Sequence, residues 1–192
     1  MSDYKNVLLV GNGPSILHAP YGKVIDEFDG LVARFNHFVL DPVEYTGTRT
    51  DVWIVNYDVG KSQTRLKKIR PNHAHLATFV PNGYNPSKNG YRDKSTGIAA
   101  MLWYLDQGYS VILHGFTHFQ RGAQKHYYSH EVTEKMWHHG DRAEVDRVMK
   151  AGLPVCRLRM LLIRRDHWWK KRKRLRQKST ETGDGGLDII TT

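Results

Sequence analysis

The segment Asn6-Val-Leu-Leu-Val-Gly-Asn-Gly-Pro-Ser15 places a short apolar run directly before a glycine-rich turn. The four apolar residues Val7 to Val10 are too few for a buried helix and indicate a strand covered on both faces, as in a parallel sheet. Gly11 and Gly13 allow a sharp turn with close backbone contacts, and Pro14 suits the first turn of a helix. Such a turn leaves N–H groups and the positive end of a helix dipole facing outward, so it predicts a site for the phosphate of a nucleotide. The alternative is an ordinary tight turn between a strand and a helix.

At 192 residues the chain is long enough for one domain with a substantial core, and its composition is typical of a soluble globular protein. It contains no run of about 18 apolar residues that would span a membrane. The first residues lack the cationic and apolar layout of a secretory signal. The single cysteine, Cys156, cannot form an internal disulfide. We therefore expect a cytoplasmic protein.

The formal net charge of +10 is concentrated near the carboxyl terminus. Residues 157–178 contain eleven Lys and Arg residues against one acid, Asp166, and the rest of the chain is close to neutral. We predict a domain over residues 1–156, a basic segment with a Trp pair over 157–178, and a polar, flexible terminus over 179–192.

Apolar runs alternate with helix-like segments along the chain, which predicts a mostly parallel α/β sheet. Strands are expected at residues 7–10, 31–36, 51–56, 76–80, 110–115 and 155–162. Helices are expected at residues 21–29, 61–68, 97–106 and 144–150. The Ser95-Thr96 pair is suited to cap the third of these helices, and residues 81–94, rich in Gly, Asn and Pro, indicate a loop.

Polar side chains follow several of the predicted strands, where ligands of parallel sheets gather. Asn12 follows the first strand, Asn36 ends the second, Ser95-Thr96-Gly97 opens a helix, and Gly115-Phe116 ends a late strand. Asparagine can donate hydrogen bonds to a phosphate without a full charge that would trap the leaving product. Simple turn chemistry is the alternative explanation for each asparagine.

Histidines are frequent between residues 114 and 139. Those in this stretch are His114, His118, His126, His130, His138 and His139. Histidine is suited to general-base catalysis near neutral pH, and Glu144 could orient the His139 imidazole or complement the dipole of the following helix. Zinc binding is an alternative, but neither an HExxH motif nor paired cysteines are present.

Together these residues resemble the sialyltransferases of glycosyltransferase family 29, whose four sialylmotifs occur here in order between about residues 6 and 152. The long motif matches at Val10-Gly11-Asn12-Gly13, Tyr21-Gly22, Ile25-Asp26, Asp29, Val32, Arg34 and Asn36. The short motif matches at Ser95-Thr96-Gly97 and Gly115-Phe116. The third motif is His126-Tyr127-Tyr128, and the very short motif is the pair His139 and Glu144.

The resemblance implies a single-domain, Rossmann-like, mostly parallel sheet with flanking helices, the modified GT-A type of this family. It implies an inverting, metal-independent transfer of a sugar acid from its CMP-activated donor to a glycan or lipid-linked acceptor, without a cofactor. His139 would be the general base, and His126 would contact the donor phosphate. The donor would be bound by Gly11, Asn12, Gly13, Asn36, Ser95, Thr96, Gly97, Gly115, Phe116 and Tyr127. Supporting residues would be Asp26, Arg34 and Glu144.

The chain also departs from the animal members of that family. The stretches near Asn6 and Gln107 carry no cysteine where those enzymes form a disulfide, and we expect no stem or membrane anchor. Both departures favour a bacterial-type, cytoplasmic relative that acts in surface-glycan synthesis. Sialic acid and Kdo are both activated as CMP esters, and the sequence does not separate them.

The basic segment 157–178 carries the Trp168-Trp169 pair, which is typical of binding to an anionic membrane surface at the inner face of the membrane. Nucleic-acid binding is a less favoured alternative, and a solvated helix is another. A dinucleotide-binding oxidoreductase is a further alternative, suggested by the glycine turn. Against it, Ile16 occupies the position of the expected third glycine.

Overall fold

The computed structural model describes residues 5–55, 67, 71–79, 95–117, 124–130 and 140–158. The chain forms two compact units, residues 1–157 and 158–192. Only Leu158 of the second unit is described, so the fold below is that of the first. The predicted helix at 61–68, apart from Lys67, lies outside the described residues, as do the predicted loop at 81–94 and the chain from 159 onward.

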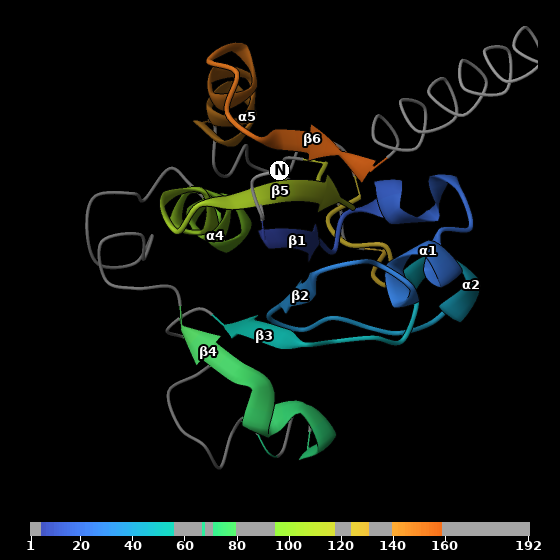
Figure 1. Ribbon diagram of the computed structural model, residues 1–192. Helices are drawn as coiled ribbons and strands as arrows, with labels where there is room; N and C mark the ends of the chain where they lie inside the picture. Colours follow the sequence, from blue (N-terminus) through green and yellow to red (C-terminus); the bar gives the residue numbers. More distant parts are fainter. Residues whose placement is uncertain are drawn as a thin grey trace, which may run out of the picture. The chain divides into compact units, whose positions relative to one another are not determined.

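Six parallel strands form one sheet in the order β4-β3-β2-β1-β5-β6 (Figure 1). The strands are β1 (Lys5–Val10), β2 (Leu31–Phe35), β3 (Val52–Val55), β4 (Ala77–Phe79), β5 (Tyr109–His114) and β6 (Val155–Arg157). The central strands are buried on both faces, as the apolar runs in the sequence require. This confirms the predicted parallel α/β sheet.

The strand order reverses between β1 and β5. From β1 the chain adds β2, β3 and β4 on one side, and then returns to add β5 and β6 on the other. Such a reversal is the topological switch point, outside which ligands bind in open α/β sheets. Val10 pairs with Arg34 on one side and with His114 on the other. The turns after β1, β2 and β5 therefore lie together at the carboxyl ends of the strands, which we call the switch-point edge.

Helices cover both faces of the sheet. Figure 1 shows α4 (Thr96–Asp106) on one side and the short helices α1 (Gly22–Asp26) and α2 (Val43–Thr46) on the other. α5 (Gly140–Lys150) shares a core cluster with α4. The members of this cluster include Val7, Leu9, Val111, Leu113, Ile98, Met101, Val145 and Val148.

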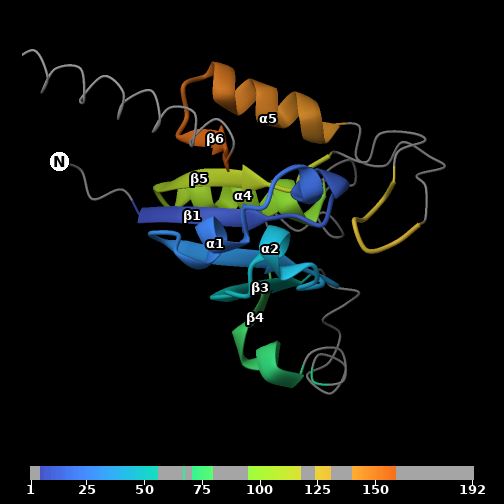
Figure 2. The same cartoon turned by 90° about the vertical axis from the view of Figure 1, so that its right-hand side faces the viewer.

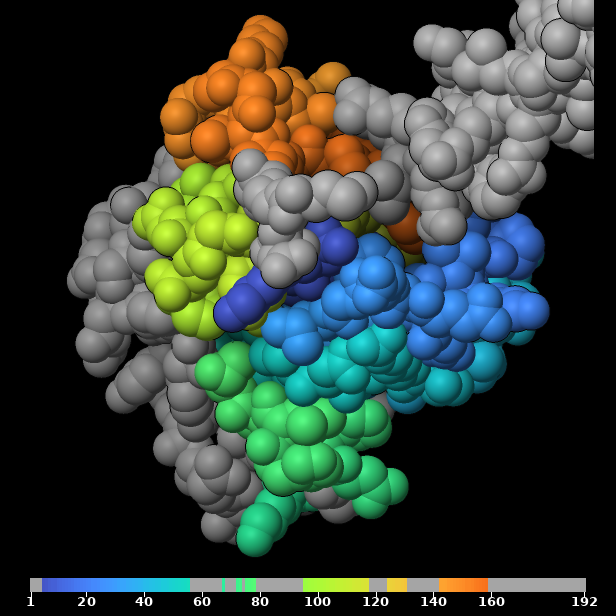
Figure 3. Space-filling view, in the orientation of Figure 1, coloured from blue at the N-terminus to red at the C-terminus, as the bar shows by residue number. Residues whose placement is uncertain are grey.

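The two outermost strands of the sheet, β4 and β6, have different neighbours. The 3-10 helix η2 (Pro71–Leu76) accompanies β4 at one end of the first unit, and α5 accompanies β6 at the other (Figure 3). Neither η2 nor α2 was expected from the sequence, because elements this short carry no hydrophobic period.

Several predicted boundaries are wrong. The helix expected at Pro14 is a 3-10 helix, η1 (Pro14–His18), and its C-cap Ala19 is extended because a proline follows. The predicted strand 155–162 ends at Arg157, because Leu158 is already helical, and residues 159–162 lie outside the described residues. α5 begins at Gly140, before the predicted start at 144, although glycine is a poor helix former. The Ser95 cap of α4 is confirmed, because its hydroxyl accepts from the N–H of Ile98.

Candidate active site

The turns after β1 and β5 are hydrogen-bonded to each other at the switch point. Gly11 N–H donates to the carbonyl of His114, and Gly13 N–H donates to the carbonyl of Gly115, both at 2.7 Å. A Cβ at Gly11 would lie 2.6 Å from the Gly115 oxygen, and one at Gly13 would lie 2.4 Å from Thr117 Oγ1. These glycines therefore allow two backbone turns to touch.

This contact corrects the prediction that N–H groups of the glycine turn face outward. The N–H groups of Gly11 and Gly13 are engaged within the protein, and η1 is a 3-10 helix of only five residues with little dipole to offer an anion. These two N–H groups are therefore not free to bind an anion, and the binding of a phosphate at this turn stays a prediction. The turn holds Asn12 at the carboxyl ends of the strands.

Asn12 joins three segments at this edge. Its Nδ2 donates to the carbonyls of Phe35 at 3.0 Å and His37 at 3.4 Å, at the end of β2. Its own carbonyl accepts from the N–H of Tyr127 at 3.0 Å. Asn36 makes the arrangement possible with a φ of +46°, a left-handed conformation that asparagine tolerates.

The segment His126-Tyr127-Tyr128 is therefore held against the turn after β1. The Tyr127 hydroxyl bonds to the carbonyl of Val39 and accepts from its N–H at 3.1 Å, and the Tyr128 hydroxyl donates to the carbonyl of His37. Gln124 closes the segment, because its Nε2 donates to the carbonyls of His126 and Ser129. The structure thus brings the predicted site residues Asn12 and His126 together from distant parts of the chain.

Phe116 packs between α4 and the end of β2. A Cβ at Gly97 would lie 2.4 Å from the Phe116 ring, so only glycine allows this approach. The Phe116 ring meets Phe35 edge to face, with centroids 5.9 Å apart. The predicted donor-binding residues Gly97, Gly115 and Phe116 thus make close contacts within the protein at the same edge, and Thr96 beside them is buried.

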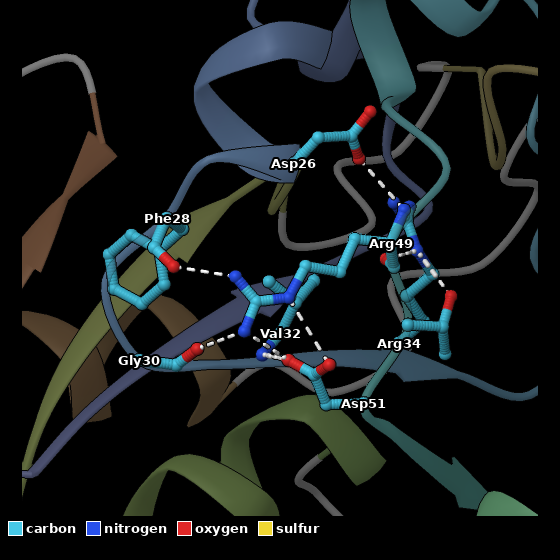
Figure 4. Close-up of polar contacts among 8 residues, drawn as sticks. Asp26, Phe28, Gly30, Val32, Arg34, Arg49 and Asp51 are labelled. Carbon is cyan, nitrogen blue, oxygen red and sulfur yellow. Dashed lines mark hydrogen bonds and ion pairs between the residues drawn. The ribbon is translucent and has the colours of Figure 1, made fainter.

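Asp26 and Arg34, two of the predicted supporting residues, hold the segment that leads into β3. Asp26 Oδ1 accepts from the N–H groups of Thr48 at 2.7 Å and Arg49 at 2.8 Å. Arg34 is only 1% exposed, and its guanidinium donates to the carbonyl of Arg49 at 3.0 Å (Figure 4). It also donates to the carbonyl of Thr46 at 2.8 Å. Both side chains therefore hold the segment between β2 and β3 in place.

Arg49 completes this network and was missed from the sequence. Its guanidinium donates to the carbonyls of Phe28 at 2.6 Å and Gly30 at 2.7 Å, and lies 2.9 Å from a carboxylate oxygen of Asp51 (Figure 4). Asp51 Oδ2 in turn accepts from the N–H of Val32. An arginine in a polar turn carries no signal that distinguishes such a clamp from a solvated charge.

His114, at the end of β5, is 8% exposed. Burial lowers the pKa of its imidazole to about 4, with the positive charges of Arg34 and His18 acting in the same direction. Its Nε2 has no hydrogen-bond partner within the part of the chain that the structure describes. The ring of Tyr21 packs edge-on against the imidazole, with centroids 5.5 Å apart. Because of the lowered pKa, His114 is a neutral core side chain near pH 7.

The predicted general base, His139, lies outside the described residues, as do His118 and His138. α5 begins at Gly140, immediately after His139 in the sequence, at the edge where β1 and β5 end (Figure 2). In α5 the Glu144 carboxylate pairs with Arg147 at 2.6 Å. Among the residues described, no three His, Cys, Asp or Glu side chains form a metal-binding group.

No helix within the described ranges combines the length and the apolar character needed to cross a membrane.

The sequence matches no protein-family model and no curated protein. Solved structures do match, over most of the chain. CstII from Campylobacter jejuni, a sialyltransferase in complex with cytidine-5'-monophosphate, aligns with a TM-score of 0.52 and 18% identity over 82% of this chain and 81% of that chain. The chain has a sialyltransferase fold.

Two further structures agree. Cst-I, a monofunctional alpha-2,3-sialyltransferase from Campylobacter jejuni, aligns with a TM-score of 0.56 and 15% identity over 82% of this chain and 77% of that chain. A mammalian sialyltransferase in complex with Gal-beta-1-3GalNAc-ortho-nitrophenol aligns with a TM-score of 0.51 and 18% identity over 81% of this chain and 69% of that chain. At these identities the likeness is one of fold, and the predicted fold type is confirmed.

Proposed function

We propose that this protein is a glycosyltransferase that moves a sugar acid from its CMP-activated donor to a hydroxyl of a glycan or lipid-linked acceptor. The carrying observation is the hydrogen bond from Tyr127 N–H to the Asn12 carbonyl. It sets the third sialylmotif-like segment against the first at the switch-point edge, where α/β sheets bind ligands. The fold it shares with sialyltransferases, one of them bound to CMP, supports the same activity.

The proposed reaction is an inverting displacement without a metal or cofactor. The acceptor oxygen bonds to the anomeric carbon, the bond from that carbon to the CMP phosphate breaks, and CMP leaves with the electron pair. His139 takes the proton of the acceptor hydroxyl, and a positioned base of this kind contributes about 10²- to 10⁴-fold. The start of α5 at the switch-point edge supports this role, because His139 directly precedes α5 in the sequence.

His126 stabilises the negative charge that develops on the leaving phosphate. A hydrogen-bonding group that is already oriented toward this charge requires no reorganisation at the moment of reaction. The neighbouring Asn12 amide is likewise fixed by two carbonyls. We assign His126 to the donor phosphate. Both N–H groups of the Asn12 amide already donate to carbonyls, so Asn12 positions the turn beside that phosphate.

The dinucleotide-binding alternative loses its support. The N–H groups of Gly11 and Gly13 donate to the turn after β5, and Ile16 is fully buried where the third glycine of a dinucleotide motif would stand. A pyrophosphate bound at this turn would have to displace both hydrogen bonds.

We further propose that residues 157–178 attach the enzyme to an anionic membrane surface near its acceptor. The support is the density of basic residues around Trp168-Trp169, at about 1 kcal/mol for each Lys or Arg close to the bilayer.

A transfer assay tests the proposed activity. Wild-type protein is incubated with CMP-sialic acid or CMP-Kdo and a panel of glycan acceptors, with and without EDTA, and acceptor-dependent CMP release is measured. We expect release with one donor, unchanged by EDTA, and its loss in His139→Ala with CMP binding retained. Release that requires a divalent metal would contradict the metal-free mechanism, and an unchanged rate in His139→Ala would contradict the assignment of the base.

A further inference from the structure

The carbonyl of His37 accepts hydrogen bonds from two directions. Asn12 Nδ2 reaches it at 3.4 Å, and the Tyr128 hydroxyl donates to the same oxygen. The left-handed conformation of Asn36 turns the chain at this point, directly after β2. One backbone oxygen therefore links the turn after β1 to the segment that carries His126.

The ring of Tyr128 lies flat against the imidazole of His126. Their centroids are 5.2 Å apart and their planes differ by 11°, which is a stacked arrangement within the usual range for aromatic pairs. Tyr127 meets the Tyr128 ring edge-on, with centroids 5.0 Å apart, and is itself buried and bonded to Val39. Tyr128 is thus fixed at its hydroxyl and at its ring.

We propose that Tyr128 is a positioning residue for His126. Its hydroxyl is anchored on the carbonyl of His37, and its ring holds the imidazole plane in one orientation relative to Asn12. This inference rests on the proposed function, in which His126 contacts the donor phosphate. An imidazole ordered before the donor arrives loses less freedom on binding, which raises affinity for the phosphate.

A merely structural role for Tyr128 makes a different prediction. If Tyr128 only strengthened the packing of residues 124–130, its replacement would weaken CMP binding equally whether or not the His126 imidazole is present. If Tyr128 acts through His126, its effect disappears once that imidazole is removed. A double-mutant cycle separates the two cases, because independent sites are additive.

The cycle combines Tyr128→Leu with His126→Ala and measures the Kd of CMP by calorimetry. Tyr128→Phe keeps the ring and removes only the hydroxyl, and we expect it to weaken CMP binding about three- to tenfold, as for the loss of one hydrogen bond. Tyr128→Leu should weaken it further. In the His126→Ala background, Tyr128→Leu should change the Kd by less than about twofold. Tyr109→Phe, at the amino-terminal end of β5, is the matched control and should leave the Kd unchanged.

A spectroscopic signal tests the stacking without CMP. The ring protons of His126, observed by NMR in histidine-labelled protein, should carry a ring-current shift that Tyr128→Leu abolishes and Tyr109→Phe leaves intact. Equal losses of CMP affinity in both backgrounds, or ring protons unmoved by Tyr128→Leu, would overturn the positioning role. Absence of CMP binding to the wild type would instead overturn the proposed function, while the NMR signal still decides whether Tyr128 holds the imidazole.

Discussion

Replacing Gly11 by alanine separates two reasons for a glycine at this turn, close contact with the neighbouring turn or close approach of a ligand. The new Cβ would lie 2.6 Å from the Gly115 oxygen and 3.1 Å from both the Gly115 carbonyl carbon and Phe116 Cδ2. Ordinary contacts begin near 3.4 Å, so the two turns must separate by most of an ångström. That shift stretches the hydrogen bonds Gly11 N–H to His114 and Gly13 N–H to Gly115, both now at 2.7 Å.

The expected cost follows from these contacts. Overpacking in a rigid environment costs about 1 to 3 kcal/mol, and each weakened hydrogen bond about 1 kcal/mol more. We therefore expect Gly11→Ala to lower the free energy of unfolding by about 3 kcal/mol, measured by urea denaturation at constant m-value. Gly108→Ala is the control: its Cβ would meet nothing within 4 Å, and only its φ of +77° makes it unfavourable, by about 1 kcal/mol.

A different pattern would refute this reasoning. If Gly11→Ala keeps wild-type stability within about 0.5 kcal/mol but loses CMP binding, the glycine serves the approach of the ligand and the contact between the turns is secondary.

The other predictions concern the charged and titrating groups. The pKa of His114 is about 4 in the folded protein and 6.5 when unfolded. Its contribution to the free energy of unfolding is therefore fully present above pH 6.5 and is lost as the pH falls toward 4, by up to about 3 kcal/mol. Urea titrations at several pH values should show this loss of stability. The loss should be smaller in His114→Gln and unchanged in His130→Gln, which replaces an exposed residue. Equal pH profiles for the wild type and both variants would contradict this prediction. Arg49→Met should lower the free energy of unfolding by about 2 kcal/mol through two lost carbonyl contacts, whereas Lys23→Met, from an exposed ion pair, should change it by less than about 0.5 kcal/mol; similar values would argue against the clamp. Replacing Lys170, Lys171 and Arg172 by Gln should weaken sedimentation with phosphatidylserine vesicles by about 10- to 1,000-fold, and stronger binding of the wild type to duplex DNA than to vesicles would contradict the membrane proposal.

The sheet was predictable because β1 and β5 are continuous apolar runs that only a doubly covered strand explains. The Ser95 cap was also predictable, since a capping hydroxyl acts within its own turn. The role of Gly11 was not, because a glycine that admits a ligand and one that admits a neighbouring carbonyl look alike in a sequence. Arg49 was missed, and Tyr128 was named in the third motif without a role of its own. Both act through backbone carbonyls far away in the chain, which leave no mark in composition or spacing.

Nucleotide binding tests the central claim most directly. Calorimetry of the wild-type protein with CMP, CDP, UDP and NAD should give heat with CMP, a smaller heat or none with UDP and NAD, and a weakened CMP response in His126→Ala. Heat with NAD and none with CMP would contradict the transferase assignment.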